Sequence, residues 1–485
     1  MGKFYWLKQV GARVQQQPAL ISMGVIWLVY VWYLPTTTYE GLYHDAHNYW
    51  DFAEDYFKTG RFTFPSYFNL KRGYFFPLLL SPFTQLVASQ HLLPLAITRC
   101  MGAVLAAVVF GWAGPALWQA VKGDRPASVA RRLLFAAVGF VLWRDHFNFS
   151  MTDFPALLAL ATSLVCLLRG RGLWSGVLAG MALAAAANMR PVYQVSMPFV
   201  GLLALLPPEG RTRWWGWARS AALGLGVAIL LMPQAYINYS HFGIPTPFVM
   251  TTVPGQPTLY VQQLQWGLTN QKYETNIGKD YPYTGMTVVD KRGKTMWEST
   301  GLSEFTAASQ YLKLCLGRPW RILGVWERHL FNGLDVQYPT PYVQAVFVST
   351  WPLAWLNYSL IFGGLVVLLA WSWQRPAQGW LRPLLVLLTL LVPCLLTLPT
   401  AMEPRFLLPL HLLLSAAVAF GAAPIRWWRA ATIWARGLMV VSYVSAIMLG
   451  FLASDSAQKH LYEVPRHIID DLPFHFLHSV NGEPW

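Results

Sequence analysis

The stretch that decides the fold class is PALISMGVIWLVYVWYLP, residues 18–35, which carries no charged side chain. About 20 apolar residues of helix cross a bilayer core of about 30 Å. Lys3, Lys8 and Arg13 precede this run, and Pro-Thr-Thr-Thr follows it without a small-residue cleavage site. We therefore expect a retained membrane anchor instead of a removed signal peptide.

Further long apolar runs follow along the chain. They lie at 93–120, 132–149, 154–168, 173–187, 192–207, 218–236, 346–372, 383–399, 406–422 and 431–453. With the first run they predict an all-α polytopic integral membrane protein of about 11 transmembrane helices. The run at 74–88 is shorter and contains Pro77 and Pro82, so an interfacial or re-entrant helix is expected there.

The composition agrees with a membrane protein. The 485 residues are 55% hydrophobic and only 12% charged, whereas soluble domains carry about 25% charged residues. This balance excludes a disordered chain, a soluble enzyme of ordinary composition and a small secreted module. Four cysteines are too few for a disulfide framework. The net charge of +14 is explained by orientation in the membrane, so no nucleic-acid partner is expected.

The basic residues set the predicted orientation, because cytoplasmic loops are enriched in Lys and Arg. If 74–88 does not span, one side collects basic residues and holds only Asp124 and Glu209 as acids. The basic residues on that side are Lys3, Lys8, Arg13, Lys122, Arg125, Arg131, Arg132, Arg169, Arg171, Arg211, Arg213, Arg219, Arg375, Arg382, Arg426, Arg429 and Arg436. The N-terminus is therefore predicted to be cytoplasmic.

This orientation divides the chain into four parts. Residues 1–236 form an N-terminal transmembrane module that includes the outer loop 36–92. Residues 237–345 form a large extracytoplasmic loop, 346–453 the C-terminal transmembrane helices, and 454–485 an extracytoplasmic tail. The large loop is polar, with little helical periodicity before 303–316. Because a structureless loop of this length is unusual, we expect a small folded cap.

The first outer loop has the pattern of an amphipathic helix. Its apolar residues occupy positions 49, 52, 53, 56 and 57, and positions 51, 54, 55 and 58 are charged. Such a helix is expected to lie on the outer membrane surface. Asp45 stands just before it, either as its N-cap or as a carboxylate that takes a proton from a substrate hydroxyl. His44 and His47 flank this Asp and would hold a divalent metal, contact substrate or simply pack.

Charged residues also mark the outer ends of three later segments. They are Asp153, Arg190, Glu403 and Arg405. Asp153 has helix N-capping as its alternative role, and the arginines could instead reach lipid headgroups or form ion pairs with these acids. Ionisable residues at membrane depth usually mark function. Acids together with guanidinium groups on one membrane face suit a substrate with both a hydroxyl and a phosphate.

Several common motifs are absent from the sequence. No Asp-x-Asp occurs, which argues against the metal and nucleotide-sugar site of soluble glycosyltransferases. Gly293-Lys294-Thr295 lacks the upstream Gly of a P-loop, and no Gly-x-Gly-x-x-Gly signature is present.

The spacing Asp45-x3-Tyr49-x3-Ala53-x3-Phe57 after the first span resembles the first-loop signature of GT-C membrane glycosyltransferases. Bacterial aminoarabinose transferases and dolichyl-phosphate-mannose protein mannosyltransferases are the groups it is most similar to. Residues 72–79 resemble their segment leading into the second helix. Asp153 matches the acid that opens their fourth span, and 403–409 resembles their late Arg-Tyr-x-x-Pro element.

The resemblance implies a GT-C-like fold and an inverting transfer from a polyprenyl-phosphate-linked sugar in the outer leaflet. Asp45 would be the base, and Asp153 would orient the acceptor or the base. The donor phosphate would be held by Arg405, Arg190 and Arg72. Supporting roles fall to Glu403, Tyr49, His44 and His47. The site would face the periplasm of a bacterial inner membrane, in a monomer that acts on a lipid, glycan or protein acceptor.

The sequence departs from the family pattern at two positions. Ala46 stands where a second acid often follows the first, and Phe406 stands where Tyr is usual. Two rival functions remain, an O-antigen polymerase or ligase and a non-enzymatic lipid or glycolipid transporter. The first does not need an acid like Asp45, and transporters usually place polar residues near the bilayer midplane.

Overall fold

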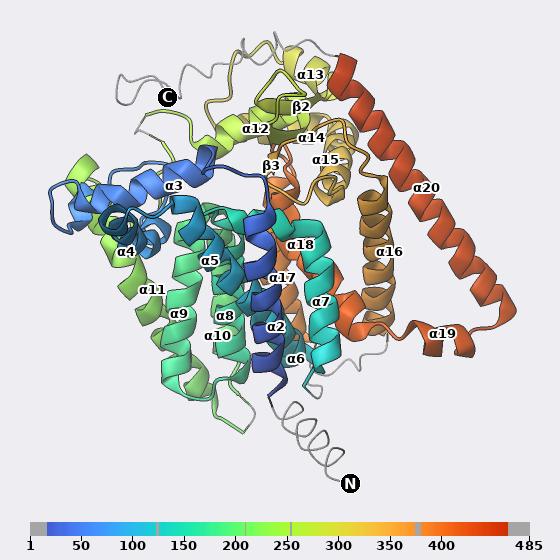
Figure 1. Ribbon diagram of the computed structural model, residues 1–485, viewed down its shortest axis with the longest axis horizontal. Coiled ribbons are helices and arrows are strands. Elements are labelled where there is room, and N and C mark those ends of the chain that lie inside the picture. The colour runs from blue at the N-terminus through green and yellow to red at the C-terminus, as the bar shows by residue number, and fades with distance from the viewer. Residues whose placement is uncertain (1–16, 123–125, 209, 253–254, 374–379, 464–485) are drawn as a thin grey trace.

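The computed structural model describes residues 17–463 except 123–125, 209, 253–254 and 374–379. Helices form a bundle, and a mixed cap of helices and a small sheet covers one end of it (Figure 1). The amphipathic helix of the first loop lies across that same end, beside the cap. This end therefore gathers the segments that the sequence predicted to face outward.

The N-terminal half of the bundle is helical wherever the sequence is apolar. Its helices are α2 (Pro18–Tyr33), α5 (Pro94–Val108), α6 (Gly114–Lys122), α7 (Val129–Trp143), α8 (Asp153–Arg169), α9 (Leu173–Met189), α10 (Met197–Leu205) and α11 (Arg213–Phe242). Pro18 and Pro94 occupy first helical turns, where proline costs no hydrogen bond. Gly243 ends α11 in the left-handed conformation, with φ of 69°.

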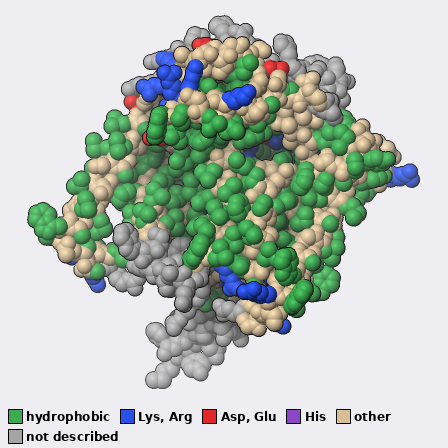
Figure 2. Space-filling model, turned by 180° about the vertical axis from the view of Figure 1, so that it is seen from behind, with side chains coloured by type: hydrophobic (Ala, Val, Ile, Leu, Met, Phe, Trp, Pro, Cys, Tyr) green, Lys and Arg blue, Asp and Glu red, His purple; other side chains and the backbone are tan. Residues whose placement is uncertain are grey.

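The C-terminal helices complete the bundle. They are α16 (Trp351–Trp373), α17 (Leu381–Thr397), α18 (Leu408–Ala416), α19 (Pro424–Ala430) and α20 (Ile433–Glu463). Helix α20 leans away from the bundle and meets it mainly along α16 (Figure 1). Broad hydrophobic areas cover the sides of the bundle, while most charged side chains in view lie toward its two ends (Figure 2). This distribution is that of a multi-pass membrane protein.

Six stretches in the described residues are long and apolar enough to cross a bilayer. They are 18–36, 94–122, 213–242, 351–370, 404–421 and 433–457. The other five predicted spans form helices of 17 residues or fewer. At 1.5 Å per residue a helix of that length falls short of the roughly 30 Å core. The predicted count of eleven is therefore not reached by helix length alone.

The prediction of an all-α chain is wrong in the cap. There α12 (Leu259–Thr269) leads into β1 (Asn270–Asn276) and β2 (Gly285–Val289), followed by α13 (Lys291–Glu298), α14 (Ala308–Gly317), α15 (Pro319–Leu334) and β3 (Tyr342–Val343). The sheet order is β2-β1-β3, antiparallel for the first pair and parallel for the second. Strand β1 reads NQKYETN. Its residues are almost all polar, so it lacks the alternation of apolar and polar residues that predicts a strand.

Several predicted boundaries also shift. Helix α11 continues past residue 236 to Phe242, and α20 continues past 453 to Glu463. The rest of the predicted tail, 464–485, and the basic residues before position 17 lie outside the described residues. In the first loop, α3 (His44–Glu54) forms as expected, and α4 (Phe75–Gln90) is not among the candidate spans.

Glycines allow a close helix crossing in the bundle, between α9 and α11. A Cβ atom on Gly226 would lie 2.0 Å from the carbonyl oxygen of Val177, and one on Gly180 would lie 2.0 Å from that of Leu223. Gly224, on the same helix as Gly226, has no atom within 4 Å of its Cβ position. The two backbones therefore touch along one face of α11 only.

We expect Gly226→Ala to push these helices apart and to destabilise the protein by about 1–3 kcal/mol, as overpacking does. Gly224→Ala is the matched control and should leave stability unchanged or slightly raised, because alanine favours helix. Thermal unfolding midpoints in detergent measure both variants. Equal midpoints for the two would contradict the crossing.

Candidate functional site

Asp45 lies in the first turn of α3, where it faces two guanidinium groups. Its Oδ1 is 2.7 Å from Nη2 of Arg72, and its Oδ2 is 3.6 Å from Nη2 of Arg405. Tyr43 is the N-cap of α3, and no side chain caps this helix. The N-cap interpretation of Asp45 is therefore wrong, and its carboxylate takes part in an ion-pair cluster.

Asp153 is the second acid of this cluster. It opens α8, and its carboxylate pairs with Nη1 of Arg190 and lies 3.7 Å from Nη1 of Arg405. Thr152 is the N-cap position, so N-capping does not explain Asp153 either. Glu403 completes the set, with its Oε2 2.5 Å from Nε of Arg405. The ion pair between Arg405 and Glu403, which the sequence left as an alternative, is thus present.

The two inner arginines are not free to reach lipid headgroups. The side chains of Arg190 and Arg405 are only 17% and 16% exposed. Both guanidinium groups also lie over the ring of Phe406, at 5.4 and 6.0 Å from its centre. Arg72 lies over the ring of Tyr49 at 5.5 Å. The aromatic rings therefore form walls around the charges.

The loop that carries Arg72 is held by local hydrogen bonds. Asn69 Oδ1 accepts from the backbone amides of Lys71 and Arg72, each at 2.8 Å. The hydroxyl of Tyr67 donates to the carbonyl of Arg72 at 2.8 Å. Position 73 must be glycine, because a Cβ atom there would lie only 2.0 Å from the backbone oxygen of Asn188. This close approach brings the Arg72 loop against the end of α9.

A buried amide chain joins that loop to the membrane helices. Asn188 Oδ1 accepts from the amide of Phe75 at 2.9 Å, and its Nδ2 donates to Gln234 at 2.9 Å. Gln234 donates onward to Asn238 at 3.0 Å. Because Asn188 stands two residues before Arg190, the same chain also positions this arginine. Buried polar groups of this kind are satisfied by one another.

The cap closes the other side of the cluster. The amide of Ala46 donates to the hydroxyl of Tyr342, which comes from β3, at 3.1 Å. The amide of Tyr273 in β1 donates to the carbonyl of Met402 at 2.9 Å. These bonds connect the cap directly to the neighbours of Asp45 and Glu403. The cluster therefore lies between the bundle and the cap.

Three guanidinium groups face three carboxylates in this cluster, so its formal charge is balanced. Burial alone would raise the pKa of Asp45. The guanidinium groups of Arg72, Arg405 and Arg190 outweigh burial and lower the pKa of this carboxyl below its usual value. Asp45 is therefore a carboxylate at neutral pH. It becomes a stronger base only if one of these cations moves away.

The two histidines do not both face Asp45. His47 lies 3.5 Å from Asp51 on the exposed side of α3, away from the cluster. His44 packs against the ring of Tyr342 at 5.7 Å, and burial lowers the pKa of its imidazole. Among the described residues, no group of three His, Cys, Asp or Glu side chains is arranged to hold a metal ion. His44 thus contacts Tyr342 beside the cluster, whereas His47 pairs with Asp51, and the supporting role of both histidines stays a prediction.

Some site residues were not predicted from the sequence. Gln234 and Asn238 lie four residues apart near the C-terminal end of α11, and their polarity in an apolar segment was a usable signal. Tyr342 carried no such signal. It lies 296 residues from Ala46, so its contact with the first-loop helix could not be predicted from any local pattern.

Comparison with known proteins gives no relative. No protein-family model, no curated protein and no solved structure matches the chain.

We expect Asp153→Asn to destabilise the protein by about 3–5 kcal/mol, because it leaves two buried guanidinium groups without their shared carboxylate. Asp51→Asn is the matched control, since its ion pair with His47 is exposed and contributes about 0–1 kcal/mol. Chemical unfolding in detergent measures the difference. Equal losses would show that the cluster contributes no more than a surface pair.

The lowered pKa of Asp45 predicts a pH dependence of stability. A carboxylate with a lowered pKa stabilises the folded state above its unfolded pKa, and this stabilisation is lost as the pH falls through the folded pKa. The wild type should thus exceed Asp45→Asn in stability at about pH 7, and the gap should close only below about pH 4. Unfolding midpoints across this range measure it. A gap that closes near neutral pH would contradict the ion pairing.

Proposed function

We propose that the protein is an inverting glycosyltransferase of the GT-C kind, which moves a sugar from a polyprenyl-phosphate carrier to an acceptor hydroxyl. The observation that carries the proposal is the convergence of Asp45 with Arg72 and Arg405. These residues belong to separate segments, yet they meet at one end of the bundle. A carboxylate and several guanidinium forks are the groups that a hydroxyl and a phosphate require.

In this reaction Asp45 removes the proton of the acceptor hydroxyl, and the acceptor oxygen attacks the anomeric carbon. The bond between that carbon and the phosphate oxygen breaks with inversion, and polyprenyl phosphate leaves with the electron pair. Arg405 and Arg190 stabilise the charge that develops on the leaving phosphate. Asp153 positions both arginines, since it pairs with each of them. Glu403 fixes Arg405 from the other side.

The balanced charge of the cluster supports a partner exchange on donor binding. Arg72 is the most exposed of the three arginines, at 38%, and it comes from a loop rather than a helix. It is therefore the guanidinium best able to leave Asp45 for the donor phosphate. That exchange would also raise the pKa of Asp45 and turn it into a stronger base. Binding of the donor would thus make Asp45 a stronger base for the transfer step that follows.

The proposed location follows from the same arrangement. The cluster lies at the cap end of the bundle (Figure 1), and in the segments predicted to lie at the opposite end basic residues far outnumber acidic ones. By the positive-inside rule the cap would face the periplasm of a bacterial inner membrane. A transporter is less well supported, because the charged residues gather at helix ends and not at the midplane.

The test is transfer from a polyprenyl-phosphate sugar by purified protein to a panel of lipid, glycan and peptide acceptors. Asp45→Asn should lower the rate by about 10²–10⁴, as loss of a general base does, while leaving a folded protein. Asp51→Asn, on the exposed side of the same helix, should transfer at the wild-type rate. Wild-type rates for folded Asp45→Asn would refute the mechanism, and no transfer to any acceptor by the wild type would refute the function.

A further inference from the structure

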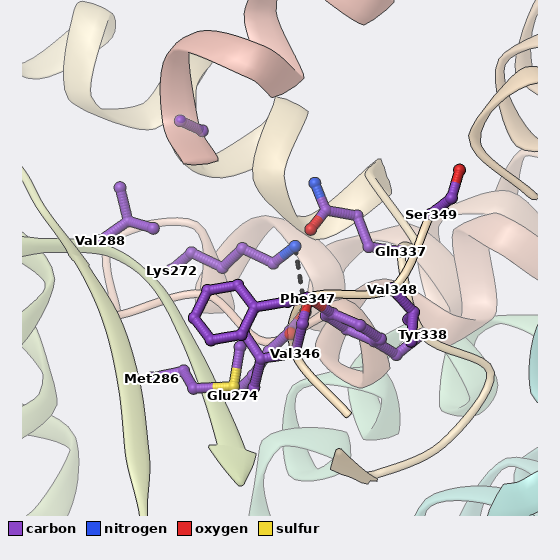
Figure 3. Close-up of a pocket in the computed structure, with 11 residues that line it drawn as sticks. Lys272, Glu274, Met286, Val288, Gln337, Tyr338, Val346, Phe347, Val348 and Ser349 are labelled. Atoms are coloured by element: carbon purple, nitrogen blue, oxygen red, sulfur yellow. Dashed lines mark hydrogen bonds and ion pairs between the residues drawn. The ribbon is translucent and has the colours of Figure 1, made fainter. Parts of the chain in front are cut away.

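The cap contains a cavity of about 330 Å³ that the proposed reaction does not use. It is lined by β1, β2, the segment 337–349 and the outer part of α20. In Figure 3 the side chains of Lys272, Gln337, Tyr338 and Phe347 surround the same space. Its volume lies at the lower end of the roughly 300–1,000 Å³ of small-molecule sites.

Two buried charges form one wall of this cavity. Lys272 Nζ lies 3.0 Å from Glu274 Oε1, and their side chains are only 6% and 12% exposed. Lys272 also donates to the carbonyl of Asp335 at 3.3 Å. Burying an ion pair costs desolvation energy that the pair seldom recovers by itself. Its position on a cavity wall points to a ligand with several hydrogen-bonding groups.

A neighbouring carboxylate fixes the orientation of Gln337. Asp335 accepts from Nε2 of Gln337 at 2.8 Å and from the hydroxyl of Ser454 at 2.9 Å on one oxygen. Its other oxygen accepts from the hydroxyl of Tyr358 at 2.7 Å. Nε2 of Gln337 donates to Ser454 as well, so its amide carbonyl is the group left for a ligand. These hydrogen bonds fix the side-chain amide of Gln337 so that its carbonyl oxygen can accept a hydrogen bond from a ligand.

Aromatic side chains supply the apolar part of the lining. Tyr338 is held by its own hydroxyl, which donates to the carbonyl of Val346 at 2.8 Å. Phe347 is 53% exposed at the rim. The backbone of the rim is held by hydrogen bonds that do not involve the Phe347 ring, because the Asp280 carboxylate accepts from the amides of Val346 and Phe347. The Phe347 ring can thus be removed without undoing these rim hydrogen bonds.

The geometry points to a saccharide site. We propose that this cavity binds a neutral sugar of the acceptor, a role that rests on the proposed function. A sugar ring offers hydroxyls to Lys272, Glu274 and Gln337 and an apolar face to the aromatic rings. A phosphate fits poorly, since Glu274 already neutralises Lys272.

The placement relative to the charge cluster suits an acceptor. Strand β1 separates the two sites, with Lys272 and Glu274 on the cavity side. The backbone of Tyr273, between them, bonds to Met402, one residue from Glu403. A sugar bound in the cavity would therefore lie one strand away from the charge cluster, at a distance that further units of the same glycan acceptor can span around β1.

The experiment is saturation-transfer NMR on the full-length protein with methyl hexosides and methyl N-acetylhexosaminides as probes. The wild type should bind at least one of them. Phe347→Ala should weaken that binding by about tenfold, while Phe347→Tyr retains it. Trp320→Ala removes another exposed aromatic of the cap, 82% exposed and outside the cavity, and should leave binding unchanged.

A second readout separates this proposal from the proposed function. Phe347→Ala should raise the KM for a glycan acceptor and leave kcat unchanged, whereas Asp45→Asn should slow transfer by about 10²–10⁴ and still bind the glycoside. Absence of glycoside binding by the wild type, or unchanged binding by Phe347→Ala, would overturn the saccharide site. Glycoside binding that is lost in Phe347→Ala, in a protein that transfers no sugar, would overturn only the proposed function.

Discussion

The cap end of this protein depends on one interaction, the ion-pair cluster in which Arg405 bridges Asp45 and Asp153. Charged groups are costly to bury and persist in a protein interior only when they are paired. Arg72 and Arg190 complete the pairing from two further segments. The first-loop helix, the ends of α8 and α9 and the start of the segment leading into α18 are thereby held in one arrangement. The cap then closes over it through hydrogen bonds to neighbouring backbone.

The same pairing constrains any chemistry at this site. Guanidinium groups lower the pKa of Asp45, so its carboxylate is a weak base while Arg72 and Arg405 stay in place. An anionic substrate that draws a guanidinium group away from Asp45 would raise the pKa of this carboxyl and make it a stronger base. A balanced cluster of this kind would therefore couple the binding of an anion to the pKa of Asp45. It also explains why charged residues can persist at the ends of apolar helices without reaching solvent.

The sequence predicted the apolar helices and most of the cluster, because both depend on local patterns and on the side of the membrane that each segment reaches. Asp45, Arg72, Asp153, Arg190 and Arg405 were all predicted to lie at one end of the helices, and they meet at the end that the cap covers. The pairing itself was left open, since spacing does not fix which acid faces which arginine. The sheet of the cap was missed because its central strand is polar.

The most direct test of this account is binding of a polyprenyl phosphate to the purified protein in nanodiscs, compared with the polyprenol of the same chain length. If the cluster exchanges a carboxylate for the donor phosphate, the phosphate should bind more tightly than the alcohol, and Arg72→Gln should remove much of that difference. Equal affinities for phosphate and alcohol would contradict the account, because the guanidinium groups would then serve only to pair with the acids.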